Sequence, residues 1–196
     1  MKKSLLLLLV SFFSLWCFAQ RTSETTISLI PQPVSLVQGS GTLKLPFSLT
    51  IIADKNEEVK RIATDLSRRL KTAANKVTVK EGKTLLPKSI LLSLTNETGM
   101  PKEGYRLKVT ATGISLTAIE PAGIFYGVQT LLQLFPKQIE SPEIQKPVNE
   151  WALPIVTIED HPRFGWRGLM LDVSRHFFTV AQVKDYIDQM VKYKFN

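Results

Sequence analysis

The stretch Arg167-Gly168-Leu169-Met170-Leu171-Asp172-Val173-Ser174-Arg175-His176-Phe177-Phe178 decides the fold that this sequence predicts. Residues 169–173 form a short and almost wholly apolar run, which is typical of a strand covered on both faces in a parallel sheet. A polar tip follows at residues 174–176. The stretch therefore predicts a buried strand that runs out into a charged loop.

A helix is predicted directly after this loop. Thr179 and Gln182 have the spacing of a capping box, and an apolar face follows at Val183, Ile187, Met190 and Val191. Strand, loop and helix make one βα unit, and in a (β/α)8 barrel the loop after a strand faces the active site. One unit cannot close a barrel, and the sequence stops at Asn196 as the helix ends. We therefore expect the chain to be the front part of a longer enzyme.

The first residues have the pattern of a secretory signal peptide. Two lysines precede an apolar run over residues 5–18, and Ala19 provides a small residue before a cut. The run is too short to be interpreted first as a membrane span. We expect residues 1–19 to be removed on export, which leaves no stable membrane span. A lipid anchor at Cys17 is the alternative, although Trp16 stands where a small residue is expected.

Cysteine content and charge narrow the functional classes further. The single cysteine lies in the expected signal peptide, so the exported chain has no disulfide and no thiol chemistry. This absence favours a bacterial protein in the periplasm, at the cell surface or secreted. The formal net charge is +8, but the basic residues are scattered, and no basic run is interleaved with aromatic residues. We interpret them as a solvated face and expect no nucleic-acid partner.

The segment before the deciding stretch predicts a small α+β domain. Alternating apolar residues predict one strand over residues 43–51 and another over residues 90–94. Between them, Asp54 to Glu57 resembles a capping box of Asp type. The helix that it opens has an apolar face formed by Val59, Ile62, Leu66, Leu70 and Ala73.

The second half of this domain reads as a hairpin and a helix. Residues 104–118 alternate around a turn at Thr112-Gly113, and a second helix starts at Glu120-Pro121 and stops before Pro136. The order of elements predicts a mainly antiparallel sheet with helices on one side. The polar residues 137–147 are the expected linker. We therefore divide the chain into a signal peptide (1–19), an α+β accessory domain (20–150) and the start of a barrel (151–196).

No complete catalytic constellation is present in the sequence. It contains no Gly-rich phosphate loop, no metal-ligand cluster and no supported Ser/His/Asp arrangement. Glycoside hydrolysis usually needs a pair of carboxylates, but Asp185 and Asp188 lie on the predicted helix and are interpreted as solvated charges. We expect no catalytic residue and no metal site in this chain.

Three polar residues at the tip of the predicted strand are the candidate site. Arg175 is the best candidate for binding substrate, because its guanidinium offers five fixed donors at the opening of a barrel strand; an ordinary ion pair is the alternative. Asp172 interrupts the apolar run and is interpreted as a buried support, with direct substrate contact as its alternative. His176 is interpreted as structural. Nearby aromatic side chains could stack on a sugar or simply pack: Trp151, Trp166, Phe177 and Phe178.

The same stretch, from Trp166 to Phe177, resembles the first catalytic-barrel strand of the β-N-acetylhexosaminidases of glycoside hydrolase family 20. Two further stretches agree with this resemblance. Ile30-Pro31-Gln32-Pro33 resembles the opening of that family's accessory domain. Gly104-Tyr105, followed by the run from Ala122 to Leu134, resembles its last hairpin and helix. The resemblance covers nearly all of the chain after the signal peptide, in the family's order.

The resemblance implies an exo-acting enzyme that removes terminal N-acetylglucosamine or N-acetylgalactosamine from glycans. It implies substrate-assisted retaining catalysis, in which the substrate's own 2-acetamido oxygen is the nucleophile, a carboxylate orients it and a glutamic acid protonates the leaving oxygen. It also implies no cofactor, and it assigns Arg175 to the sugar hydroxyls of the terminal residue. The family's adjacent Asp-Glu pair lies on later strands and is absent from this sequence. We therefore expect residues 21–196 alone to be catalytically silent.

Two alternatives remain open from the sequence. The chain could be a non-catalytic carbohydrate-binding or scaffold module, although such a module would not be expected to leave one barrel unit exposed. It could also belong to another glycosidase family with a similar leading domain, such as the O-GlcNAcase-like or α-glucuronidase enzymes. The stretch Leu171-Asp172-Val173-Ser174-Arg175-His176 favours the β-N-acetylhexosaminidases over these other glycosidases.

Overall fold

The structure, a computed structural model, describes residues 27–140 and 151–196, apart from positions 73 and 75. The expected signal peptide, Cys17 and most of the expected linker lie outside these residues. Within them, no helix is both long enough and apolar enough to cross a membrane.

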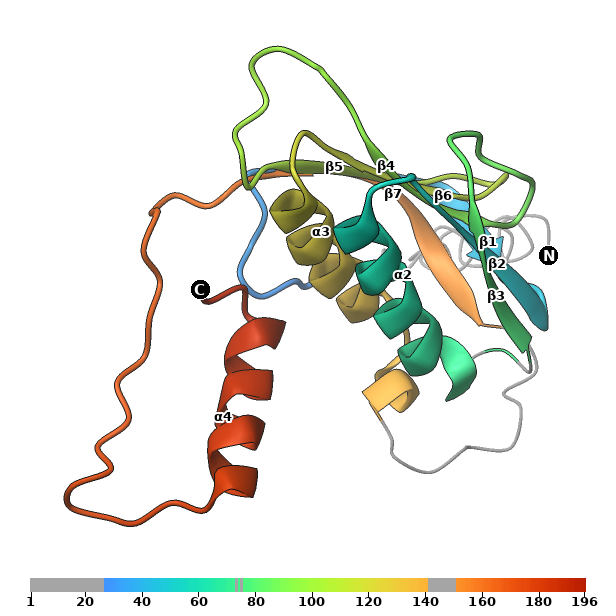
Figure 1. The fold of residues 1–196 in the computed structure, drawn as a ribbon. Coiled ribbons are helices and arrows are strands. Elements are labelled where there is room, and N and C mark those ends of the chain that lie inside the picture. The colour runs from blue at the N-terminus through green and yellow to red at the C-terminus, as the bar shows by residue number, and fades with distance from the viewer. Residues whose placement is uncertain (1–26, 73, 75, 141–150) are drawn as a thin grey trace, which may run out of the picture.

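The described chain forms a seven-stranded sheet, two helices that pack on it and a separate C-terminal helix (Figure 1). The strands are β1 (Ser35–Lys44), β2 (Ser48–Ala53), β3 (Lys76–Glu81), β4 (Ile90–Leu94), β5 (Tyr105–Val109), β6 (Ile114–Ala118) and β7 (Ala152–Asp160). The helices are α2 (Glu57–Arg69), α3 (Pro121–Leu134) and α4 (Val180–Lys192), with short 3-10 turns η1 (Leu70–Thr72) and η2 (Lys137–Glu140).

The sheet is mixed, with the strand order β1-β7-β5-β6-β4-β2-β3. The β1–β7, β7–β5 and β5–β6 pairs are antiparallel, whereas β6–β4, β4–β2 and β2–β3 are parallel. The α+β class is thus confirmed, and the predicted hairpin is the β5–β6 pair. The sheet is less antiparallel than expected, because helix α2 carries the chain from β2 across to β3 in the same direction, as a crossover helix does.

Helices α2 and α3 lie on the same side of the sheet (Figure 1), as the sequence predicts. Helix α3 approaches the sheet most closely at two glycines. A Cβ at Gly123 would overlap the carbonyl oxygen of Gly104, and one at Gly127 would overlap a methyl group of Leu116. Glycine at these positions therefore lets the apolar side chains of α3 reach the core, where Ile124 and Leu131 are fully buried.

The strand predicted over residues 43–51 is in fact two strands. β1 ends at Lys44 and pairs with β7, whereas β2 begins at Ser48 and pairs with β3 and β4 at the other side of the sheet. Leu43, Leu45 and Leu49 are all buried, so the apolar alternation runs on across the break, but Phe47 between them is exposed. Alternation in the sequence indicates which side chains are buried, but it does not show where the chain changes from one neighbouring strand to another.

Helix α2 begins two residues later than the predicted Asp cap. Its N-cap is Asn56, whose Oδ1 accepts the backbone N–H groups of Glu58 (2.9 Å) and Val59 (3.2 Å). Asp54 is buried instead, where its Oδ2 accepts the N–H of Leu94 at 3.3 Å. Both residue types cap helices well, so local chemistry alone favours neither position.

Strand β3 was not predicted from the sequence. Its sequence KVTVKE alternates two valines with polar residues, which was an available signal. The strand lies at the edge of the sheet and carries lysines, as edge strands that avoid aggregation commonly do. That charge made the segment resemble a polar loop.

Strand β7 is an integral part of the sheet, although the expected domain division places it with the barrel. It pairs with β1 over Ser35 to Lys44 and with β5 over Tyr105 to Val109. A division after Asp160 agrees better with this pairing than one between residues 150 and 151. The chain then leaves the sheet in a long loop before α4 (Figure 1).

The predicted strand over residues 169–173 is not formed. These residues lie in the loop between β7 and α4, where Leu169 and Val173 are exposed and Met170 is 90% exposed. A strand needs neighbouring strands to satisfy its backbone and cover its side chains. None of the described strands pairs with this run, so its apolar sequence has no partner to fold against.

The predicted helix after this loop is confirmed. Thr179 caps α4 through a reciprocal capping box with Gln182. No residue of α4 is buried within the described chain. On the predicted apolar face, Val183, Met190 and Val191 are half-buried and Ile187 is exposed.

Candidate functional site

The three predicted site residues lie on the loop between β7 and α4. Asp172 organises this loop, because its Oδ1 accepts the backbone N–H groups of Ser174 (3.0 Å) and Arg175 (3.1 Å). Its Oδ2 forms an ion pair with Nε of Arg175 at 3.2 Å. The Asp172 side chain is 38% exposed, so the expectation that it is a buried support is wrong for this chain. Asp172 instead stabilises a partly exposed turn of the loop by accepting these two backbone N–H groups.

Arg175 is 84% exposed, and its guanidinium is free to meet a ligand apart from the contact with Asp172. An exposed ion pair of this kind contributes at most about 1 kcal/mol, so a ligand could displace it at little cost. His176 is also exposed and takes no part in the contact. The structure therefore brings two of the three predicted residues together.

The aromatic side chains near the loop divide into two groups. Trp166 and Phe177 are exposed, as a stacking surface requires. Trp151 is buried and packs 6.0 Å from the ring of Phe135, so it belongs to the core. Among the described residues, no group of three or more His, Cys, Asp or Glu side chains could hold a metal ion.

A second polar cluster holds the base of the same loop, and none of its residues was predicted as a site residue from the sequence. Asp160 ends β7, and its Oδ2 accepts hydrogen bonds from the Tyr105 hydroxyl (2.8 Å) and from Nζ of Lys194 (2.8 Å). The Lys194 ammonium also donates to the Tyr105 hydroxyl at 2.9 Å. That hydroxyl lies 2.5 Å from Oγ1 of Thr130 on α3. One network therefore joins two strands, helix α3 and the residues after α4.

These groups are removed from water, which alters their protonation. Burial lowers the pKa of Lys194, and the nearby Asp160 carboxylate opposes this shift only in part. Burial also raises the pKa of Tyr105, with the negative charge of Asp160 as the second cause. The Tyr105 phenol therefore keeps its proton, and the ammonium of Lys194 is balanced by the carboxylate.

The other end of the loop is tied to the same place through Arg167. Its Nε donates to the carbonyl oxygen of Lys194 at 2.8 Å, and its backbone N–H donates to Oδ1 of Asn196 at 2.9 Å. The guanidinium lies 5.2 Å from the ring centre of Tyr126 on α3. Nη2 lies 2.8 Å from Oε2 of Glu103, close enough for an ion pair but not aligned for a hydrogen bond.

A cavity of about 340 Å³ lies beside these contacts. Its polar wall contains Tyr105, Asp160 and Lys194 from the cluster, and its rim contains the exposed Arg163 and Phe164. The groups in the wall already pair with one another, so the cavity marks a junction between the sheet and the loop.

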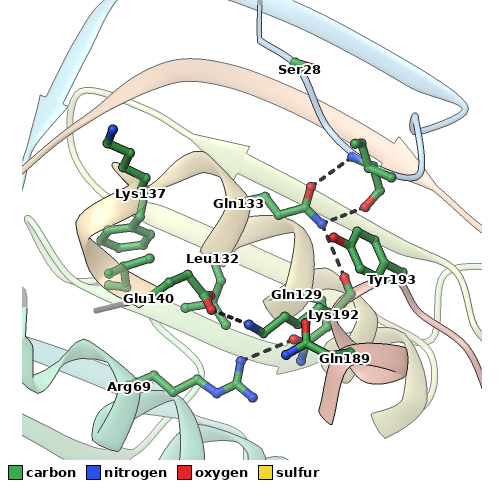
Figure 2. A pocket seen from close by; sticks show the side chains of 13 residues that line it. Ser28, Arg69, Gln129, Leu132, Gln133, Lys137, Glu140, Gln189, Lys192 and Tyr193 are labelled. Carbon is green, nitrogen blue, oxygen red and sulfur yellow. Dashed lines mark hydrogen bonds and ion pairs between the residues drawn. The ribbon is translucent and has the colours of Figure 1, made fainter. Parts of the chain in front are cut away.

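A second crevice, of about 370 Å³, lies between α3, η2 and α4 (Figure 2). Gln133 bridges it, because its side-chain amide exchanges hydrogen bonds with the backbone of Ile30 (2.9 and 2.7 Å) and donates to the carbonyl oxygen of Lys192 at 3.3 Å. Lys192 pairs with Glu140 on η2. Figure 2 shows these side chains directed toward one another across the crevice, which indicates a seat for the end of α4.

The chain matches two consecutive family models. Residues 26–161 match "Glycosyl hydrolase family 20, domain 2", and residues 164–196 match "Glycosyl hydrolase family 20, catalytic domain". Residues 162–163 separate the two matched ranges, so the boundary lies just after the end of β7.

Similar proteins carry names that agree with these matches. A "Beta-hexosaminidase" of Porphyromonas gingivalis is 36% identical over 172 residues, which are 87% of this chain and 22% of that protein. A "Beta-N-acetylhexosaminidase" of Cellulomonas fimi is 33% identical over 177 residues, 87% of this chain and 33% of that protein. This chain thus spans about a fifth to a third of the length of these curated relatives.

Solved structures agree with this in fold. The Streptomyces plicatus N-acetyl-beta-hexosaminidase in complex with Thio-NAglucal has 37% sequence identity and a TM-score of 0.76, over 86% of this chain and 33% of that chain. The Flavobacterium johnsoniae chitobiase has 28% identity and a TM-score of 0.66, over 86% of this chain and 26% of that chain. Most of this chain therefore has a counterpart of the same fold in both.

Proposed function

Because this chain belongs to glycosyl hydrolase family 20, we propose that the whole protein is an exo-acting β-N-acetylhexosaminidase that removes terminal N-acetyl-D-hexosamine residues from glycans. The observation that carries the proposal is the succession of the two family models, which cover the sheet domain and then the loop and helix α4. The names of the relatives support the activity.

The proposed reaction is hydrolysis with retention, assisted by the substrate. The carbonyl oxygen of the 2-acetamido group attacks the anomeric carbon, and the leaving oxygen takes a proton from an acid of the enzyme. Water then opens the cyclic intermediate and restores the acetamido group. In the described residues no Asp is followed directly by Glu, and the reversed pair Glu159-Asp160 is already bonded to Arg106 and Lys194. These roles therefore belong to other parts of the whole protein.

Arg175 is proposed to bind hydroxyl groups of the terminal sugar. Its exposed guanidinium provides a planar set of donors, and Asp172 holds its backbone and Nε in place. In a complete barrel the loop after the first strand would face the active site, which places Arg175 at the sugar. His176 is proposed to support the loop.

The surroundings of the site are also part of the proposal. Residues 1–19 are proposed to direct export, with the enzyme in the periplasm, at the cell surface or secreted. The sheet domain up to Asp160 is proposed to be an accessory domain that packs on a (β/α)8 barrel begun by the following residues. The expected partners are glycans that end in N-acetylglucosamine or N-acetylgalactosamine.

The test is hydrolysis by the whole protein. A chromogenic N-acetyl-β-glucosaminide should be cleaved, and the matched β-glucoside, which lacks the acetamido nucleophile, should not be cleaved above the blank. Equal cleavage of both substrates would refute substrate assistance, and cleavage of neither would refute the proposed activity. Residues 21–196 alone should cleave neither substrate; turnover by them would contradict the assignment of the catalytic roles to other parts of the protein.

A further inference from the structure

We propose that Lys194 is a positioning residue for the sugar-binding loop: with Asp160 and Tyr105 it forms a buried clamp that fixes this loop against the sheet domain. The inference rests on the proposed function, since it describes how the site that contains Arg175 is held in place. The proposed role of the clamp is to hold the loop, and sugar binding is assigned to Arg175.

The first argument is that both ends of the loop meet at one point. Lys194 reaches Asp160 at the end of β7 and Tyr105 at the start of β5, while its carbonyl oxygen accepts a hydrogen bond from Arg167. The side-chain amide of Asn196 donates to the carbonyl oxygen of Gly165 at 2.8 Å. The segment from residue 167 to residue 194 is therefore closed at its base, and Arg175 lies on the loop within this segment.

The second argument is the backbone of Lys194. The N–H of Lys194 donates to the carbonyl oxygen of Val191, and the N–H of Phe195 donates to the carbonyl oxygen of Met190. These two bonds form the Schellman pattern of a helix end. Lys194 has the left-handed conformation of this pattern, with φ of 63°. Glycine is the usual residue there, because a side chain is strained in this region. A lysine at this position indicates that the contacts of its ammonium offset the strain in its own backbone.

The third argument is burial. Lys194 is only 7% exposed, and a buried ammonium is costly unless it is paired and hydrogen-bonded. Asp160 supplies the opposite charge, and the Tyr105 hydroxyl supplies a second acceptor. Asp160 is held in turn, since its Oδ1 accepts the N–H of Val34 at 3.3 Å. The pair is therefore held by groups from several elements, and a displaced end of α4 would lose these contacts.

The clamp affects the reaction through Arg175. A misplacement of about 1 Å at a binding group can reduce turnover by up to about a hundredfold. If the clamp opens, the loop keeps the contacts of Arg167 and Asn196 and the seat of α4 at Gln133, but it loses its buried ion pair with the sheet. The sugar hydroxyls then lose a positioned donor, which weakens substrate binding more than it slows the chemical step.

The test uses Lys194→Gly in the whole protein. Glycine keeps the left-handed helix end and removes the ammonium, so the variant is expected to fold. We expect its kcat/KM for the chromogenic N-acetyl-β-glucosaminide to fall about ten- to a hundredfold, mainly through a higher KM. The control is Lys184→Met, which removes an exposed lysine of α4 that lies outside both the clamp and the seat of α4, and it should leave kcat/KM within about twofold of wild type.

Two further readouts separate positioning from general stability. In an Arg175→Ala background, Lys194→Gly should cause little additional loss, because both changes remove the same contact. Trypsin should also cleave the Lys194→Gly variant faster than wild type after Arg163, Arg167 or Arg175, as mapped by mass spectrometry. Unchanged kcat/KM and cleavage, or a full additional loss in the Arg175→Ala background, would overturn the inference. A whole protein that hydrolyses nothing refutes the proposed function instead, and the cleavage rates still decide the clamp.

Discussion

Replacing Gly123 with alanine tests the packing that brings the clamp together. A Cβ at this position would overlap the carbonyl oxygen of Gly104 and lie 2.7 Å from Cβ of Ala118. Carbon atoms in contact are normally about 3.5–4.0 Å apart, so α3 would have to move away from the β5–β6 hairpin by about 1 Å. This movement would also lengthen the 2.5 Å contact between Thr130 and Tyr105.

The two energetic effects of Gly123→Ala have opposite signs. Overpacking costs about 1–3 kcal/mol, and the upper part of that range applies because the obstacle is backbone. Alanine returns about 1 kcal/mol through its higher helix propensity. The free energy of unfolding should therefore fall by about 1–2 kcal/mol, although helix propensity alone predicts a gain.

The assay is equilibrium urea unfolding of residues 20–196, followed by far-UV circular dichroism. Gly165→Ala is the matched control, because a Cβ at Gly165 meets no other atom within 4 Å. It should change the free energy of unfolding by less than about 0.5 kcal/mol. A Gly123→Ala variant as stable as wild type, or more stable, would show that α3 does not lie against the hairpin as described.

Two further predictions concern a cap and a protonation state. Asn56→Ala should lower the free energy of unfolding by about 1 kcal/mol, whereas Asn56→Asp should keep it, as urea unfolding would measure; equal stability of all three proteins would contradict the Asn56 cap. The raised pKa of Tyr105 means that the folded chain keeps a proton which the unfolded chain releases above about pH 10, so stability should fall as the pH rises through that value. The Tyr105→Phe variant should be less stable than wild type at neutral pH and should lose less free energy of unfolding than wild type between pH 9 and pH 11. If this free energy falls equally with pH in both proteins, Tyr105 is not the group responsible.

The elements that the sequence predicted well are those specified by neighbouring residues. The hairpin follows from alternation around a short turn, and α3 follows from Pro121 in its first turn. The capping box of Thr179 and Gln182 was also confirmed. In each of these cases the residues that make the deciding contacts lie within a few positions of one another.

The errors arise where the deciding contact is distant or outside the described chain. Residues 169–173 have the composition of a buried strand, but a composition becomes a strand only when neighbours pair with it. The break between β1 and β2 depends on which strands they join, and the apolar pattern is the same on both sides of it.

The candidate site was predicted in part, for the same reason. The ion pair of Asp172 with Arg175 spans three residues and could be anticipated. The clamp joins Tyr105, Asp160 and Lys194, which are up to 89 positions apart. The available local signal was a lysine just after the end of a predicted helix, where glycine is the usual residue. The residues near Lys194 in the sequence do not indicate that it pairs with Asp160 and Tyr105.

The most direct test of the central claim is the kcat/KM of an Arg175→Ala variant of the whole protein, measured with the chromogenic N-acetyl-β-glucosaminide. The loss of one or two hydrogen bonds from a charged donor should cost about 2–3 kcal/mol, which is about a 30- to 150-fold lower kcat/KM. Arg68→Ala, which removes an exposed ion pair on α2, should leave kcat/KM unchanged. An Arg175→Ala variant with the kcat/KM of wild type would contradict the claim that this loop holds the sugar.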